Sequence, residues 1–170
     1  MRAILTIAAM AALAACSGEK DKGPTQREQI GQTWKYEGGE GESAKGAKGA
    51  KVAYIGSANA VRTMTAPDTF SVLLVQPLKN GTADVTVKLV GAPFTCDLSD
   101  CRVTARIDGG KAEEWKGRVA TNDDGITIAP SQGAYAAIRK AKTVTVDLVV
   151  DGKEQTAPFT FNVAGLDLRG

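Results

Sequence analysis

Few side chains in this sequence are suited to chemistry, because the chain has three cysteines and no histidine. Without an imidazole, the usual general base and the commonest metal ligand are missing. Cys96 and Cys101 could form a disulfide, hold a metal ion or act in redox chemistry. A structural zinc needs four nitrogen or sulfur ligands, and the redox motif is Cys-x-x-Cys. The spacing therefore favours a structural disulfide that pins the strand ending near Phe94 to the strand beginning near Arg102.

Paired carboxylates are the remaining candidates for acid–base chemistry. Asp123-Asp124 and Glu113-Glu114 lie in polar surroundings beside turn residues, which is typical of a solvated surface. Asp97 and Asp100 could bind calcium together with backbone carbonyls, but such residues more often stabilise a turn. We therefore expect no catalytic residue, no metal site and no cofactor, so that the protein is not an enzyme.

The first fifteen residues have the layout of an export signal. Arg2 supplies a positive charge, and residues 3–15 contain no charge. A helix of thirteen residues spans about 20 Å, which is short of the roughly 30 Å apolar core of a bilayer. The segment is thus better explained as a signal peptide than as a membrane-spanning helix.

The end of this segment, Leu13-Ala14-Ala15-Cys16, resembles the bacterial lipobox. The resemblance implies cleavage before Cys16 and attachment of lipid to its thiol, and two or three acyl chains give stable anchoring. Ser17 in place of aspartate implies transfer to the outer membrane, facing the periplasm. An ordinary signal peptide with an accidental cysteine is the alternative, and Leu13 fits its cleavage pattern poorly.

The mature chain divides into a tether and one domain. Residues 16–33 are polar and have little to bury, which predicts a flexible lipidated tether. Residues 34–170 are enough for a single domain. Removal of Arg2 leaves 20 basic side chains (21 minus 1) against 19 acidic ones, so the charge predicts no nucleic-acid partner.

Alternating apolar residues predict a mainly β domain. Asn80-Gly81 and Asp108-Gly109 are hairpin signals between such runs. One segment, 131–142, has helical spacing, with Ser131 as its expected N-cap and cations in its last turn. We expect an antiparallel β-sandwich or partly closed barrel with this one short helix. The expected strands lie near residues 34–36, 52–55, 70–75, 85–90, 102–107, 115–120, 126–129, 143–150 and 159–163.

Two surface features have a functional and a structural interpretation. The Gly/Lys-rich stretch 38–51 could touch anionic lipid or a glycan, and a solvated flexible loop is the simpler interpretation. The aromatic side chains could form a binding face, although core packing is the commoner fate of an aromatic residue on a strand. The candidates for this face are Trp34, Tyr36, Tyr54 and Trp115.

From Trp34 onward the chain resembles a β-rich domain of bacterial envelope proteins, some of them associated with type VI secretion. The matching segments are Phe94-Thr95-Cys96, Cys101-Arg102-Val103, Arg106-Ile107-Asp108-Gly109 and Phe159 to Leu166. The resemblance supports the fold and implies no catalytic residues. The 38–51 loop resembles an insertion relative to that pattern.

The anchor and the lack of catalytic groups together predict a non-catalytic envelope lipoprotein that binds a partner protein of the envelope or has a structural role. The alternative is an immunity or inhibitor lipoprotein that neutralises a cell-wall-degrading enzyme, because small disulfide-pinned β domains suit inhibitors. A carboxylate-based hydrolase is the third hypothesis. The expected partners are the lipid bilayer, through acylated Cys16, and an envelope protein.

Overall fold

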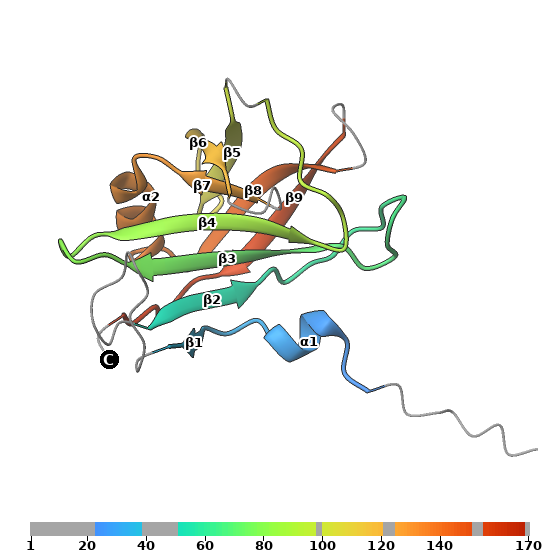
Figure 1. Cartoon of the computed structure of the whole chain (residues 1–170), viewed down its shortest axis with the longest axis horizontal. Coiled ribbons are helices and arrows are strands. Elements are labelled where there is room, and N and C mark those ends of the chain that lie inside the picture. The colour runs from blue at the N-terminus through green and yellow to red at the C-terminus, as the bar shows by residue number, and fades with distance from the viewer. Residues whose placement is uncertain (1–22, 39–50, 98–99, 121–124, 151–154, 169–170) are drawn as a thin grey trace, which may run out of the picture.

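The computed structural model describes residues 23–38, 51–97, 100–120, 125–150 and 155–168. These residues form a single nine-stranded antiparallel sheet and two helices (Figure 1). The strand order is β1-β2-β3-β4-β7-β6-β5-β8-β9, and the sheet does not close on itself. The elements are α1 (Gln26–Ile30), β1 (Lys35–Glu37), β2 (Val52–Gly56), β3 (Phe70–Pro77), β4 (Ala83–Val90), β5 (Arg102–Ile107), β6 (Ala112–Val119), β7 (Gly125–Ile128), α2 (Ser131–Ile138), β8 (Thr143–Val150) and β9 (Gln155–Asn162).

The sheet curls so that its two halves share one core. In Figure 1, β2, β3 and β4 lie side by side, with β8 and β9 behind them. Leu73 and Val87 from the front half and Phe159 and Phe161 from the back half belong to one cluster of buried side chains. Their burial removes apolar surface from water and is the main stabilising contribution to the domain. The expected fold class, a mainly antiparallel β domain with few helices, is confirmed.

Strand β6 joins the two halves at Gly117. Its first part pairs with β5, from Arg102↔Lys116 to Arg106↔Ala112, and its last residues pair with β7. A side chain at Gly117 would place its Cβ 2.2 Å from the Thr127 carbonyl oxygen. Only glycine therefore fits where this strand passes between its two neighbours.

Both hairpin turns that the described residues include are confirmed. Gly81 (φ 78°) turns the chain between β3 and β4. Asp108 (φ 48°) and Gly109 (φ 69°) form a two-residue turn closed by a hydrogen bond from the Gly110 N–H to the Ile107 carbonyl. Positive φ at both central residues is the geometry that matches the twist of the flanking strands.

The expected helix exists, but its ends differ from the prediction. It ends at Ile138 rather than 142, so no basic residue lies in its last turn. Ser131 is the first helical residue, the N-cap is Pro130, and no side chain caps the helix. Pro130 already sets an extended conformation before the helix, so Ser131 is not needed as the cap. Ala134 and Ile138 are its buried side chains, and its main neighbour is β4.

The chain contacts the domain before the expected boundary at Trp34. Thr25 and Glu28 form a capping box at α1, whose hydrogen bonds lower the pKa of the Glu28 carboxyl. The Arg27 guanidinium donates to the Ala58 carbonyl at 3.1 Å, and the Gly56 N–H donates to the Gly31 carbonyl. Residues 25–31, expected in the tether, therefore pack beside β2.

Several sequence predictions fall outside the described residues. These are the signal segment 1–15, Cys16 with the start of the tether, residues 39–50 of the Gly/Lys-rich loop, and Asp123-Asp124. Among the residues that the structure does describe, no helix is both long and apolar enough to cross a membrane.

Candidate functional site

The face of the sheet that points away from the core carries a continuous cross-strand row of side chains. Tyr54 pairs with Leu74, Leu74 with Thr86, and Thr86 with Thr127. Thr127 in turn pairs with Arg118 on β6. Because alternate residues of a strand point to one face, all five side chains lie on the same surface. We call this surface, across β2, β3, β4, β7 and the end of β6, the outer face.

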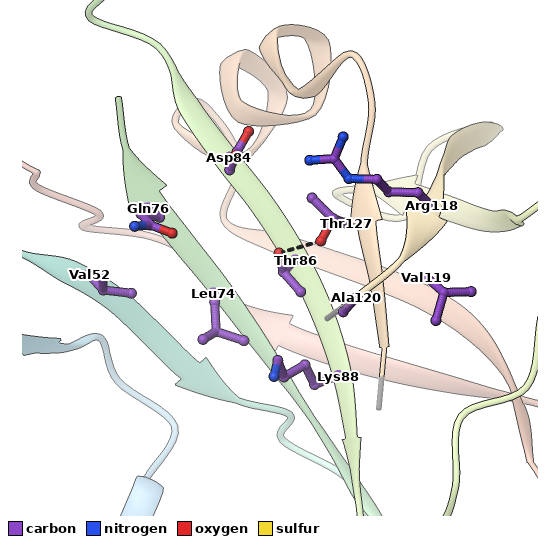
Figure 2. A pocket seen from close by; sticks show the side chains of 10 residues that line it. All are labelled: Val52, Leu74, Gln76, Asp84, Thr86, Lys88, Arg118, Val119, Ala120 and Thr127. Carbon is purple, nitrogen blue, oxygen red and sulfur yellow. Dashed lines mark hydrogen bonds between the residues drawn. The ribbon is translucent and has the colours of Figure 1, made fainter. Parts of the chain in front are cut away.

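A depression of about 430 Å³ lies on the outer face (Figure 2). At its centre the Thr86 and Thr127 hydroxyls share a hydrogen bond of 3.1 Å. Gly125 lies next to this pair. A Cβ at this position would lie 2.1 Å from the Val87 carbonyl oxygen, so only glycine lets β7 approach β4 this closely. The lining side chains are Val52, Leu74, Gln76, Asp84, Thr86, Lys88, Arg118, Val119, Ala120 and Thr127.

The lining of the depression combines apolar surface with both signs of charge. Leu74 supplies apolar surface, Asp84 an anion, and Lys88 and Arg118 two cations. Asp84 pairs across the strands with Gln76, and Lys88 pairs with Val72. An arrangement of this kind can orient a ligand by hydrogen bonds and charge.

The structure does not bring the four aromatic candidates together on one surface. Trp34 donates its indole N–H to the Val163 carbonyl at 2.9 Å, and the Tyr36 hydroxyl accepts from the Asp167 N–H at 3.0 Å. These two residues hold the C-terminal segment against the start of the domain. Trp115 is only 6% exposed and belongs to the core cluster.

Tyr54 is the aromatic candidate that lies on the outer face. Its hydroxyl donates to Glu37 at 2.7 Å. This hydrogen bond, helped by partial burial, raises the pKa of Tyr54. Beside it, Ile30, Val72, Leu74 and Val90 line a shallow apolar hollow that continues the depression through Leu74 and Lys88. The outer face thus extends from β6 to α1.

Cys96 and Cys101 form a disulfide. The expectation that it pins a strand ending near Phe94 is wrong, because β4 ends at Val90. The disulfide instead ties the connection after β4 to the start of β5. Cys101 is buried and its carbonyl accepts from the Gly117 N–H, so the crosslink lies beside the bend of β6.

Of the acidic candidates in the described chain, Glu114 and Asp100 form ion pairs with Arg102. Glu113 and Glu114 point to opposite faces of β6, and Glu114 accepts from Arg102 at 2.6 Å. Asp100 accepts from Arg102 as well, and the two carboxylates raise the pKa of this guanidinium. No group of three or more potential metal ligands occurs among the described residues.

Sequence reasoning missed the outer face as a site. The alternation in β4 already places Asp84, Thr86 and Lys88 on the side opposite the core. The missing information was that β7 pairs with β4, because this contact joins Thr127 and Arg118 to the same row. A single sequence carries no local signal for that pairing.

The fold and the outer face define a mainly β domain with an open, polar depression on one face of its sheet. Comparisons with known protein families, characterised proteins and solved structures found no match for this chain.

Proposed function

We propose that this chain is a non-catalytic lipoprotein of the bacterial envelope, anchored through Cys16, that binds a partner protein with its outer face. The depression on that face carries the proposal: about 430 Å³, lined by the apolar Leu74 together with the charged Asp84, Lys88 and Arg118. Protein interfaces likewise combine apolar contacts with polar and charged groups. The lipobox-like segment before Cys16 and the absence of histidine from the sequence support the remaining parts of the proposal.

The binding part of the proposal is tested by photocrosslinking in living cells of the native host. A photoreactive amino acid replaces Leu74 in the full-length chain, and adducts are isolated from the envelope. We expect one reproducible protein adduct. The identity of that protein distinguishes an envelope component from a cell-wall-degrading enzyme, as the inhibitor alternative requires.

Charge reversal supplies the matched comparison. Arg118→Glu should reduce the adduct about tenfold, because reversal of a charge at an interface costs roughly 1–2 kcal/mol. Lys140→Glu reverses an exposed charge just after α2, off the outer face, and should leave the adduct unchanged. Equal effects of the two variants, or the absence of any adduct, would show that the outer face is not the binding surface.

The anchor is tested separately. Intact mass spectrometry of the native protein should show a chain that begins at Cys16 and carries acyl groups. Cys16→Ser should move the protein from the membrane fraction to the soluble fraction. An unmodified N-terminus, with the native protein soluble after fractionation, would contradict anchoring and leave the outer-face proposal to its own test.

A further inference from the structure

The free edges of the sheet differ in how their backbone groups are covered. Strand β1 has only three residues. On β9, the Thr160 N–H donates to the Asn59 side chain at 2.9 Å, and the Thr160 carbonyl accepts from the Ala58 N–H at 2.7 Å. Pro158 on the same strand has no N–H to offer. Short strands, prolines and covering loops are the usual protection of a sheet edge against added strands.

The first half of β6 forms a further edge that lacks this protection. Strand β7 pairs with β6 only at Gly117, Arg118 and Val119. The Gly117 N–H donates to the Cys101 carbonyl, and the Lys116 carbonyl accepts from the Ala129 N–H. Backbone groups alternate in direction along a strand, so the N–H and C=O of Glu114 point away from β5. Within the described chain, no backbone group pairs with them.

A groove of about 500 Å³ runs along this open edge. One wall is β6, with Trp115, and the other is α2. The groove side of α2 carries only small residues, Gly133, Ala134 and Ala137, and a Cβ built on Gly133 meets nothing within 4 Å. There is thus room beside the edge for the apolar side chains of one more strand.

The carboxylate of Glu113 favours a bound segment that carries a positive charge. It shares a face of β6 with Trp115, is exposed, and forms no ion pair with the described residues. Glu114 is paired with Arg102, and Lys116 points to the opposite face from Glu113. A basic side chain opposite Glu113 would be favoured. A second copy of this chain is disfavoured, because antiparallel pairing of two β6 edges brings acidic residues together.

We propose that the open edge of β6, at residues 112–116, binds an extended peptide segment of a partner protein by strand addition. The bound segment places small apolar side chains against Gly133 and Ala137 and a lysine or arginine opposite Glu113. Backbone hydrogen bonds to Glu114 supply affinity, and the groove and Glu113 supply specificity. The site shares no lining residue with the depression on the outer face, so each can be tested alone.

The probe is a fluorescein-labelled, end-blocked hexapeptide, Val-Thr-Val-Thr-Lys-Thr, in which the valines and the lysine share one face of the extended strand. It is titrated with the full-length chain and followed by fluorescence anisotropy. Glu114→Pro removes the outward N–H, while the β5-facing groups of Glu113 and Trp115 remain. Glu114→Ala is the matched control, because it loses the same carboxylate and keeps the N–H. We expect Glu114→Pro to bind about tenfold more weakly than Glu114→Ala, the loss of roughly one hydrogen bond.

Two further variants keep the proposal falsifiable if Glu114→Pro unfolds. Gly133→Leu fills the groove from a helix position with free space and should abolish binding. A probe with glutamate in place of lysine should bind several-fold more weakly, and Glu113→Gln should remove this difference.

Hydrogen-exchange mass spectrometry should show new protection in residues 112–116 when the probe binds. Equal affinity of the two Glu114 variants when both are folded, unchanged binding by Gly133→Leu, or protection that maps elsewhere would each overturn the proposal. Dimerisation of the free chain through this edge, detected by sedimentation, would overturn it in favour of a second copy.

Discussion

At the scale of single residues, Asp108 has two separate roles. It adopts the positive φ that the β5–β6 turn requires, which aspartate tolerates better than most residues. Its Oδ1 accepts from the Lys142 and Thr143 N–H groups, both at 2.8 Å. One side chain thus joins the hairpin to the start of β8. These hydrogen bonds, first from Thr143 and then from Lys142, lower the pKa of the Asp108 carboxyl.

The lowered pKa predicts how stability depends on pH. A carboxyl whose pKa is lower in the folded state stabilises the protein above its ordinary pKa, and this contribution is lost as the pH falls through the folded value. Asp108→Asn keeps the turn and removes the charge. Its melting temperature should lie below that of the wild type at pH 7, and the difference should shrink towards pH 2.

Circular dichroism melting between pH 7 and pH 2 measures this effect. Asp84→Asn, on the outer face, is the control and should change the melting temperature little, because Asp84 forms no hydrogen bond with the residues that the structure describes. A difference at Asp108 that stays constant down to pH 2 would mean that its charge does not contribute.

The sequence predicted which face of a strand a side chain lies on, but it did not predict which residues that side chain contacts. The alternation of Val85, Val87 and Leu89 with polar residues correctly divided β4 into a core face and a solvent face. The division of Trp34, Tyr36, Tyr54 and Trp115 among three environments was not predictable. It depends on residues 163–167, which are distant in sequence and come near only in the folded chain.

At the scale of elements, two glycines with opposite surroundings give a paired prediction. At Gly117, Cβ would lie 2.2 Å from the Thr127 carbonyl oxygen and 2.8 Å from the Ile126 side chain. Gly117→Ala must separate β6 from β7 and should destabilise the domain by about 2 kcal/mol or more. Gly133 in α2 has free space, so Gly133→Ala should stabilise by about 0.5–1 kcal/mol through helix propensity.

Urea unfolding followed by tryptophan fluorescence separates these two effects. The midpoint should fall for Gly117→Ala and rise slightly for Gly133→Ala, with similar slopes. A near-neutral Gly117→Ala would show that the bend of β6 can relax, and the assignment of this glycine as the link between the two half-sheets would be wrong.

The strands could be predicted from sequence, whereas their order could not. Each strand carries its own alternation, and the β3–β4 and β5–β6 hairpins follow from local turns. The contacts β4·β7 and β5·β8 join strands that are separated by other elements. Such pairings are selected by the shared core rather than by any local pattern, and both candidate binding surfaces depend on them.

At the scale of the whole molecule, the disulfide links regions that the sheet order keeps apart. Cys96 follows β4 in the chain, while Cys101 precedes β5, and two strands of the sheet, β7 and β6, lie between β4 and β5. The crosslink therefore restrains the connection that crosses from one half of the sheet to the other. The loop that it closes is short, and the chain-entropy argument gives about 2 kcal/mol of stabilisation.

Replacement of both cysteines, Cys96→Ala with Cys101→Ala, should lower the melting temperature by about 5 °C, as expected for a loss of this size in a domain of this length. The fold should persist, because the core cluster around Leu73, Val87 and Phe159 spans both halves of the sheet without the crosslink. Calorimetry of the double variant beside the oxidised wild type gives the shift, and the reduced wild type should match the variant. Loss of the cooperative transition would mean that the disulfide, rather than the shared core, holds the two half-sheets together.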